Sequence, residues 1–320
     1  MHVGQRTEVH KSKRMKVLVT GASGYIGRHV LLPLLDSGCE VYAISRRMNV
    51  DFEWPPGVRV LTLDLFDDAA RQKAFSEISP QWLLHLAWYA EHGKFWEAQD
   101  NIAWLSLSIR MLGEFAQQGG QRLVVSGTCA EYRWDGEPCR EVSTPLEPRS
   151  LYGICKATLF RFLEAAAARL GLSYAWGRIF LLYGSSEFEG RLIAATARAL
   201  LQGQPALCTH GKQVRDLLHV EDVARALVRI LTSRVEGPVN IGSGEPIAIA
   251  QAVSELAQRA GRTDLLRLGA LPAHEDDVPL LIPDISRLRD EVGFRPALTL
   301  AQGLHKTLEW WEGHLREQST

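Results

Sequence analysis

Short apolar runs alternate along the chain with longer segments in which apolar residues recur at helical spacing. The short runs predict β-strands at residues 16–20, 40–45, 58–63, 82–86, 122–126 and 174–180. The longer segments predict helices at residues 28–36, 67–78, 101–117 and 151–170. Strands that alternate with helices indicate a doubly wound parallel sheet with helices on both faces.

The last part of the chain is less regular. Helical runs at residues 192–202, 221–232, 248–260 and 299–314 are separated by proline and glycine. We predict a nucleotide-binding α/β domain over residues 15–180. A smaller substrate domain over residues 181–320 is expected to be interleaved with late elements of the first. The polar residues 1–14 are expected to form a flexible tail.

Composition narrows the class of protein. The 320 residues include 36 Lys and Arg against 37 Asp and Glu, so the net charge is −1, and apolar residues make up 46%. This balance argues against a nucleic-acid partner, and no apolar run is long enough to span a membrane. Five widely spaced cysteines without a Cys-x-x-Cys pair indicate neither a disulfide framework nor a metal site. We expect a soluble cytoplasmic protein without metal.

Three glycines follow the first predicted strand. Gly21, Gly24 and Gly27 stand three residues apart and lead into the helix at 28–36. Glycine allows a tight turn and lets a pyrophosphate approach the N-terminus of the helix, where free N–H groups favour an anion. This context predicts a dinucleotide site; an ordinary glycine-rich turn is the alternative.

The end of the second predicted strand bears on the choice of dinucleotide. Ser45, Arg46 and Arg47 stand where NAD-binding proteins carry a carboxylate for the ribose 2′-hydroxyl. Arginine suits a 2′-phosphate, so we predict NADP(H) in preference to NAD(H), with Arg46 as the main ligand. Alternatively, both arginines are solvated loop residues. Asp64 could accept a hydrogen bond from the adenine or serve a turn.

Tyr152 and Lys156 lie four residues apart in the helix predicted at 151–170. Side chains at this spacing share one helix face, and a neighbouring ammonium lowers the pKa of a phenol. The pair could then exchange a proton with a carbinol oxygen during hydride transfer. Ser126 and Thr128 end the strand before this helix, and either hydroxyl could bond the same oxygen; both could instead cap backbone groups.

Taken together, these motifs resemble those of a known family. The chain is similar to the extended short-chain dehydrogenase/reductases, in particular the NAD-dependent epimerase/dehydratase group that modifies nucleotide sugars. The resemblance spans residues 15–315. It rests on residues 20–27, 85–87, 152–156, 214–222 and 239–245, on Asn101, and on Thr128 followed four residues later by Tyr132.

The resemblance implies a Rossmann fold and a set of roles. Thr128 rather than Ser126 would be the catalytic hydroxyl, Tyr152 the acid/base, and Lys156 a ribose ligand that lowers the tyrosine pKa. The implied cofactor contacts are Gly21, Ser23, Gly24, Tyr25, Ile26, Gly27, Ser45, Arg46, Arg47, Asp64, Leu65, Leu86, Ala87, Tyr152 and Lys156. The implied substrate contacts are Trp88, Tyr132, Arg191 and Arg215.

In the family an arginine at the position of Arg215 contacts the diphosphate of a nucleotide sugar, while a structural pair with Asp216 is the alternative here. The resemblance also implies a homodimer that packs through the helices at 101–117 and 151–170. No partner other than the nucleotide sugar is implied.

Departures from the family pattern narrow the predicted reaction. Cys129 and Ala130 replace the acidic pair of the dehydratases, and Leu181 replaces an asparagine common in 4-epimerases. We therefore predict NADP(H)-dependent reduction of a nucleotide-linked keto-sugar, at C4 of a 6-deoxyhexose. The alternative is a nucleotide-sugar epimerase that acts through a transient keto-sugar. A binding protein that has lost catalysis would have lost Tyr152 or Lys156, and both are present.

Overall fold

A parallel seven-stranded sheet forms the centre of the molecule. The computed structural model describes residues 14–48, 52–273 and 277–318. The strand order is β10-β6-β5-β4-β1-β2-β3. These strands are β1 (Lys16–Thr20), β2 (Glu40–Ser45), β3 (Arg59–Thr62), β4 (Trp82–His85), β5 (Arg122–Thr128), β6 (Ser173–Ile179) and β10 (Gly237–Ile241).

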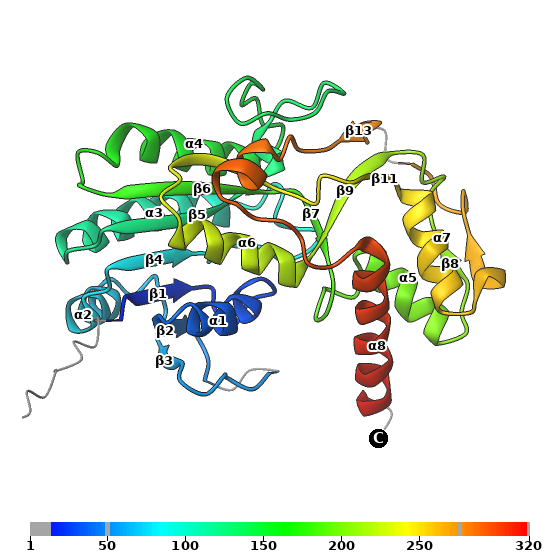
Figure 1. Cartoon of the computed structure of the whole chain (residues 1–320), viewed down its shortest axis with the longest axis horizontal. Coiled ribbons are helices and arrows are strands. Elements are labelled where there is room, and N and C mark those ends of the chain that lie inside the picture. Colours follow the sequence, from blue (N-terminus) through cyan, green and yellow to red (C-terminus); the bar gives the residue numbers. More distant parts are fainter. Residues whose placement is uncertain (1–13, 49–51, 274–276, 319–320) are drawn as a thin grey trace, which may run out of the picture.

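Helices cover both faces of this sheet (Figure 1). One face carries α2 (Asp68–Ile78), α3 (Asp100–Gln117) and α4 (Leu151–Ala166), and the other carries α1 (Gly27–Asp36) and α6 (Val220–Thr232). Alternate residues of β1 point to opposite layers: Val17 and Val19 pack with α1 and α6, whereas Leu18 packs with α2 to α4. A strand buried on both faces must be apolar throughout, which explains its continuous apolar run.

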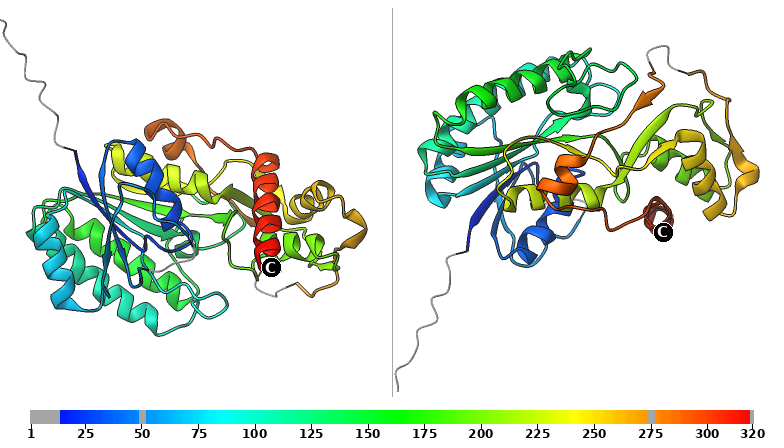
Figure 2. Two further views of the ribbon diagram at one scale, coloured as in Figure 1. Left: turned by 90° about the horizontal axis from the view of Figure 1, so that it is seen from below. Right: turned by 45° about the horizontal axis from the view of Figure 1, so that its top comes forward.

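A smaller helical part of the molecule lies beside the central sheet. It contains α5 (Leu192–Leu201), α7 (Ile249–Arg259) and α8 (Leu300–Gln318), which pack on one another around a separate apolar core. Figure 2 shows α8, in red, running beside α5 and α7 and away from the central sheet. The accompanying short strands are β7 (Leu181–Tyr183), β8 (Ala206–Leu207), β9 (Val214–His219), β11 (Pro246–Ala248), β12 (Leu266–Arg267) and β13 (Leu280–Leu281).

The two parts are interleaved along the chain. After β7 and β9 the chain returns to the central sheet through α6 and β10, and β10 pairs with β6. The doubly wound sheet with an interleaved smaller part was predicted from the sequence, but β7, β9 and β11 were not. The exact division at residue 180 stays a prediction. The predicted tail lies outside the described residues, apart from Arg14.

The ends of the central strands meet at one edge. β1 pairs with β2 on one side and with β4 on the other, and β4 in turn pairs with β5. Because all these strands are parallel, their carboxyl ends, Thr20, Ser45, His85 and Thr128, lie along the same edge. The order reverses beside β1, and ligands of open α/β sheets bind at such a switch point.

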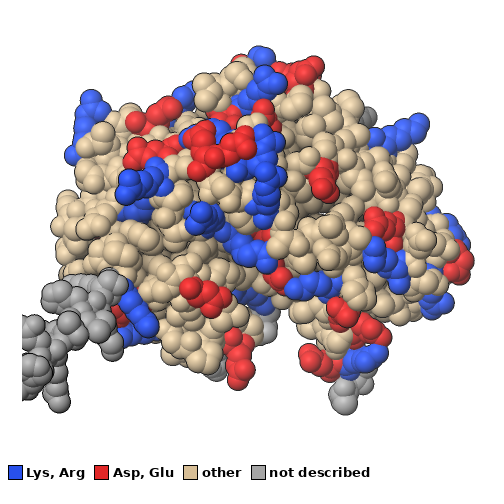
Figure 3. Space-filling view, viewed as in Figure 1, with Lys and Arg blue, Asp and Glu red and all other residues tan. Residues whose placement is uncertain are grey.

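The molecular surface carries charges of both signs. Figure 3 shows basic and acidic side chains interspersed over one face of the molecule. None of the described helices combines the length and the apolarity that crossing a membrane requires.

Candidate functional site

The glycine turn between β1 and α1 is shaped by close backbone approach. Gly21 has a φ of 71°, and a Cβ there would lie 2.7 Å from the backbone nitrogen of Ala87. A Cβ on Gly27 would lie 1.9 Å from the carbonyl oxygen of Gly21. Glycine is therefore required at both positions, because neither close contact leaves room for a side chain.

The N-terminus of α1 is suited to an anion. Ile26 precedes the helix without a side-chain cap, and the first turn holds no acidic residue. The backbone N–H groups of Arg28 and His29 donate to the carbonyls of Gly24 and Ile26, so the turn continues directly into the helix. The turn and the uncapped helix end fit the pyrophosphate of a dinucleotide, with Gly21, Ser23, Gly24, Tyr25, Ile26 and Gly27 as the residues that would surround it.

The end of β2 lies next to this turn. The buried Ser45 hydroxyl donates to the carbonyl of Arg47 at 2.7 Å and lies 3.1 Å from the hydroxyl of Ser23. Arg46 and Arg47 are exposed. The Asp64 carboxylate accepts from the backbone N–H of Phe66 at 3.0 Å, so it serves the turn after β3.

A hydrogen-bonded chain fixes the end of β4. The Ser108 hydroxyl donates to the carbonyl of Trp104, so it accepts from His85 Nε2, 3.0 Å away. His85 Nδ1 is then an acceptor, and the Thr20 hydroxyl donates to it at 2.7 Å. Burial lowers the pKa of His85 to about 3, with Lys156 acting in the same direction. His85 is thus a neutral structural group that holds β1, β4 and α3 together.

Thr128 and Tyr152 meet at the end of β5. The Thr128 hydroxyl accepts from the N–H of Ala130 at 3.2 Å and lies near enough to the Tyr152 phenol to affect its pKa. The Tyr152 ring packs edge-on against Phe95 and Trp96, with centroids 4.9 and 5.9 Å away. This burial raises the pKa of Tyr152, and the nearby Thr128 hydroxyl opposes the rise.

The Lys156 side chain reaches the end of β5. Its ammonium donates to the carbonyl of Ser126 at 2.8 Å and lies 4.1 Å from the ring centre of Trp88. Among the described residues, the groups that shift the Tyr152 pKa are Thr128, Glu131, Cys129 and Arg191. The lowering of the phenol pKa by Lys156 stays a prediction, because in this structure the ammonium is engaged by the Ser126 carbonyl and the Trp88 ring. The two residues share one helix face, but the flexible lysine reaches the end of β5 instead.

Burial also changes the charge of Lys156. The residue is 2% exposed, and desolvation lowers its pKa to about 7, although Glu131 opposes the shift. Its surroundings are a backbone carbonyl and an aromatic face, neither of which carries a full charge. Near neutral pH the ammonium is thus only partly protonated, which is a property of residues that exchange protons.

Trp88 lies against Lys156. Its indole N–H donates to Asn101 Oδ1 at 2.8 Å, and the Asn101 amide donates to the carbonyls of Phe95 and Ala98. Asn101 is fully buried. The loop at residues 86–99 is therefore clamped onto α3, with the Trp88 face turned to Lys156. Trp88 is half-buried, and its contact with substrate stays a prediction.

Two further predicted substrate contacts, Tyr132 and Arg215, interact with other side chains of the protein. Tyr132 is 1% exposed, and its hydroxyl donates to Asn240 Oδ1 and accepts from Arg178 Nη1. Tyr132 is a core residue, so its prediction as a substrate contact is wrong. Arg215 is paired with Asp277, while Asp216 accepts from the backbone of the turn at residues 243–244. The Arg215–Asp216 pair considered from the sequence does not form.

Arg191 acts on both the glycine turn and the end of β5. Burial raises the pKa of both Tyr25 and Tyr152, and the charge of Arg191 opposes each rise. Its Nε lies 3.2 Å from Oε1 of Glu187, which is buried against the start of α5. Burial raises the pKa of Glu187 to about 7. Glu187 could not be predicted from the sequence, because nothing in its local pattern distinguishes it from a solvated loop acid.

The remaining predicted cofactor contacts flank the same edge. Leu65 is buried in the loop after β3, and the N–H of Ala87 donates to the Thr20 hydroxyl at 3.3 Å, beside Leu86. A cavity of about 410 Å³ elsewhere is lined by Tyr183, His219, Phe294 and Leu300, among others, and holds none of the predicted catalytic residues. The described residues contain no cluster of three metal-binding side chains.

Comparison with known proteins agrees with this architecture. Residues 17–242 match the NAD dependent epimerase/dehydratase family. The chain belongs to this family. The match includes β1, the glycine turn, Thr128, Tyr152 and Lys156.

Relatives with known activities are enzymes that act on nucleotide sugars. UDP-glucuronic acid decarboxylase 1 of Danio rerio is 27% identical, over 96% of this chain and 75% of that protein. The dTDP-6-deoxy-L-talose 4-dehydrogenase (NAD(+)) of Aggregatibacter actinomycetemcomitans is 27% identical, over 75% of this chain and 89% of that protein. The UDP-glucose 4-epimerase of Thermus thermophilus, solved as a complex with NAD, has a TM-score of 0.83 and is 28% identical, over 93% of this chain and 99% of that one.

Replacing Gly27 by alanine tests the glycine turn. The added Cβ meets the Gly21 carbonyl, so we expect the turn to open and the dissociation constant for dinucleotide to rise more than about 10-fold. Equilibrium titration of the variant measures this. Gly113→Ala is the control, because a Cβ on that helical glycine meets nothing within 4 Å. Equal binding by Gly27→Ala and the native protein would contradict the assignment.

Replacing Lys156 by methionine tests its desolvation. Between pH 7 and about 10, the unfolded chain carries a proton at Lys156 that the folded protein lacks, so native stability rises with pH. Below pH 7 both states are protonated and the folded protein bears the full desolvation penalty. We expect Lys156→Met to be more stable than the native protein at pH 6 by roughly 1–3 kcal/mol, with the gain shrinking towards pH 10.

Urea unfolding at several pH values measures this difference. Lys73→Met is the matched control, because that side chain is 74% exposed and its replacement removes no buried charge. A Lys156→Met variant that is less stable at pH 6, or equally changed at all pH values, would refute the desolvated lysine.

Proposed function

We propose that this protein is a nucleotide-sugar 4-epimerase that uses bound NAD(H). The observation that carries the proposal is the juxtaposition of the Thr128 hydroxyl and the Tyr152 phenol at the carboxyl end of β5, at the same sheet edge as the glycine turn of β1. Two hydroxyls placed together at the switch point of the sheet are suited to one carbinol oxygen. The Thermus epimerase, which resembles the chain over nearly its whole length, supports the reaction class.

The reaction needs a proton to leave and return at one sugar oxygen. Bound NAD(H) would supply the hydride chemistry at C4 of the sugar. Tyr152 would take the proton from the C4 hydroxyl and give it back to the keto oxygen. Thr128, fixed by the N–H of Ala130, would donate to that oxygen as negative charge develops on it.

Arg191 and Lys156 have separate roles around this pair. Burial raises the pKa of Tyr152, and the positive charge of Arg191 offsets part of that rise. Lys156, whose ammonium is buried next to the end of β5, is the proposed ribose ligand. Arg191 and Arg215, the two arginines retained from the predicted substrate contacts, are the proposed phosphate or sugar ligands.

NAD(H) replaces the NADP(H) predicted from the sequence. The Thermus epimerase was solved with NAD, and the Aggregatibacter dehydrogenase is named for NAD(+). Arg46 and Arg47 are exposed, in keeping with the alternative that they are solvated loop residues. An epimerase keeps its cofactor and consumes none, so a free exchange of NADP(H) is not needed.

A 4-ketoreductase is the second candidate. Ser45 ends β2 without a carboxylate to bond a ribose 2′-hydroxyl, and the Aggregatibacter relative is a 4-dehydrogenase. The same residues would serve this reaction, but with net transfer of hydride from free cofactor to a keto-sugar.

One assay separates the two candidates. The purified protein is incubated with UDP-glucose and with a nucleotide-linked 4-keto-6-deoxyhexose, and both the sugar isomers and the absorbance of reduced nicotinamide are followed. Interconversion of UDP-glucose and its C4 epimer without net cofactor change supports the epimerase. Stoichiometric loss of NADH or NADPH with the keto-sugar, and no isomer of UDP-glucose, would replace it with the reductase.

Tyr152→Phe tests the proposed acid/base. Loss of the hydroxyl removes the proton acceptor, so we expect kcat to fall by about 10²- to 10⁴-fold while dinucleotide binding is retained. Tyr42→Phe is the matched control, because its hydroxyl contacts Glu40 and Arg59 away from the site. Turnover by Tyr152→Phe within about twofold of the native rate would refute the role.

A further inference from the structure

A buried carboxylate lies directly behind the catalytic threonine. Glu131 is fully buried in the short helix η1 (Cys129–Glu131) that follows β5. Its Oε1 accepts from the backbone N–H of Thr128 at 2.8 Å. Together with the bond from the Ala130 N–H to the Thr128 hydroxyl, this closes a capping box around the turn.

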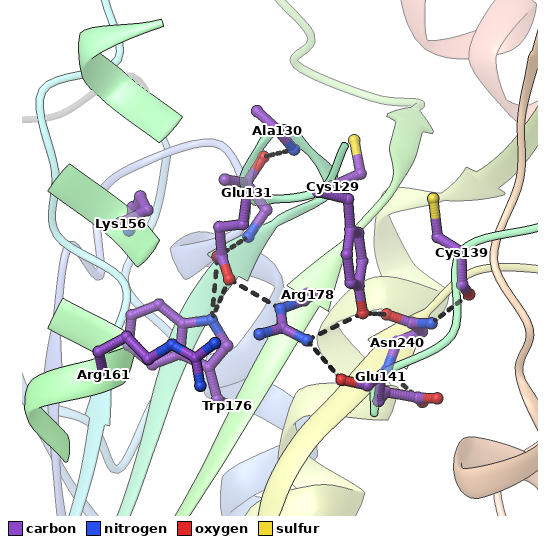
Figure 4. Close-up of polar contacts among 12 residues, drawn as sticks. Cys129, Ala130, Glu131, Cys139, Glu141, Lys156, Arg161, Trp176, Arg178 and Asn240 are labelled. Atoms are coloured by element: carbon purple, nitrogen blue, oxygen red, sulfur yellow. Dashed lines mark hydrogen bonds and ion pairs between the residues drawn. The ribbon is translucent and has the colours of Figure 1, made fainter. Parts of the chain in front are cut away.

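Two residues of β6 hold this carboxylate. The indole N–H of Trp176 lies 2.9 Å from Oε1, and Nε of Arg178 lies 2.7 Å from Oε2 of Glu131. A Cβ on Gly127 would lie 2.1 Å from Trp176 Nε1, so the strand before the turn is also packed against this contact. Figure 4 shows Glu131 between helix α4, which carries Lys156, and the two β6 side chains.

Arg178 extends the contact to a third strand. Its Nη1 donates to the Tyr132 hydroxyl at 2.9 Å, and that hydroxyl donates to Asn240 of β10 at 2.7 Å. The guanidinium also stacks over the rings of Tyr132 and Phe160, 4.6 Å from each centre. The Glu131–Arg178 pair is therefore anchored by β5, β6 and β10, and Figure 4 shows Arg178 lying between Glu131 and Asn240.

We propose that Glu131, held by Arg178, is a positioning residue that fixes Thr128 against the Tyr152 phenol. The proposal rests on the proposed function, since it assigns Glu131 to the same catalytic pair. Glu131 touches neither substrate nor cofactor; it acts through the Thr128 backbone. The acidic pair of the dehydratases stands at residues 129 and 130, so Glu131 is one residue too far for elimination chemistry, and the structure assigns it this different task.

The geometry favours positioning over general stabilisation. A buried ion pair is weak support for folding, because desolvation offsets most of its attraction. The hydrogen bonds fix the orientation of the Glu131 carboxylate, because three donors from two strands converge on it. The residue that carries the reacting hydroxyl is therefore fixed at its backbone, and displacement of a catalytic group by about 1 Å can reduce rates 10²-fold.

Glu131→Gln is the central test. The amide has nearly the same shape, but its NH₂ group must face a donor from Thr128, Trp176 or Arg178, so the turn shifts. We expect kcat for UDP-glucose to fall about 10- to 100-fold, while KM and the dinucleotide dissociation constant change less than about threefold. Hydrogen exchange of the Thr128 amide in the full-length protein should speed up at the same time.

Glu114→Gln is the matched control. Glu114 bonds the fully buried Arg71 across α2 and α3, so this variant also breaks a buried ion pair, but far from the catalytic turn. We expect lower thermal stability with kcat and Thr128 exchange unchanged. If Glu131→Gln and Glu114→Gln reduce stability alike and both leave kcat within about twofold, Glu131 is only structural and the proposal is overturned.

Arg178→Lys provides a second route if Glu131→Gln does not fold. Lysine keeps the buried charge but loses the planar fork that joins Glu131 to Tyr132, so we expect an intermediate fall in kcat with KM unchanged. The exchange measurement separates this proposal from the proposed function. A native protein without epimerase activity would refute the function, whereas unchanged Thr128 exchange in both variants would refute the positioning role alone.

Discussion

Helices cover both faces of the central sheet, and this coverage dictates where polar chemistry can lie. Val17, Leu18 and Val19 alternate between two dry layers, so the middle of this strand is apolar. Hydroxyl and imidazole groups occur where the strands end, at Thr20 and His85. Because the strands are parallel, their carboxyl ends lie along one edge of the sheet. The common strand direction therefore determines where the site lies.

Much of this organisation could be predicted from sequence. Apolar runs and helical periodicity are local signals, and the glycine spacing reports a turn whose close approach, 1.9 Å between a Gly27 Cβ and the Gly21 carbonyl, excludes other residues. The predicted positions of Thr128 and Tyr152 likewise depended on the end of one strand and the start of one helix. Local pattern was sufficient wherever neighbouring residues decide the geometry.

Local pattern was insufficient where distant elements decide the geometry. Arg215 pairs with Asp277, 62 residues away, rather than with its neighbour Asp216. Tyr132 is buried because β6 and β10 supply partners for its hydroxyl, and no pattern around it reports those strands. Lys156 shares a helix face with Tyr152, yet the carbonyl that it reaches lies on β5. A long side chain has several acceptors within reach, and packing selects among them.

The return of the chain to the central sheet has a consequence for biosynthesis. β10 lies on the far side of β6 and is contributed by residues 237–241, after much of the smaller part has been made. While the ribosome is still adding the intervening segments, the edge of β6 has no partner strand. The sheet face that α6 later covers is also exposed to solvent. An N-terminal fragment ending near residue 180 would keep that exposed edge and be prone to aggregate.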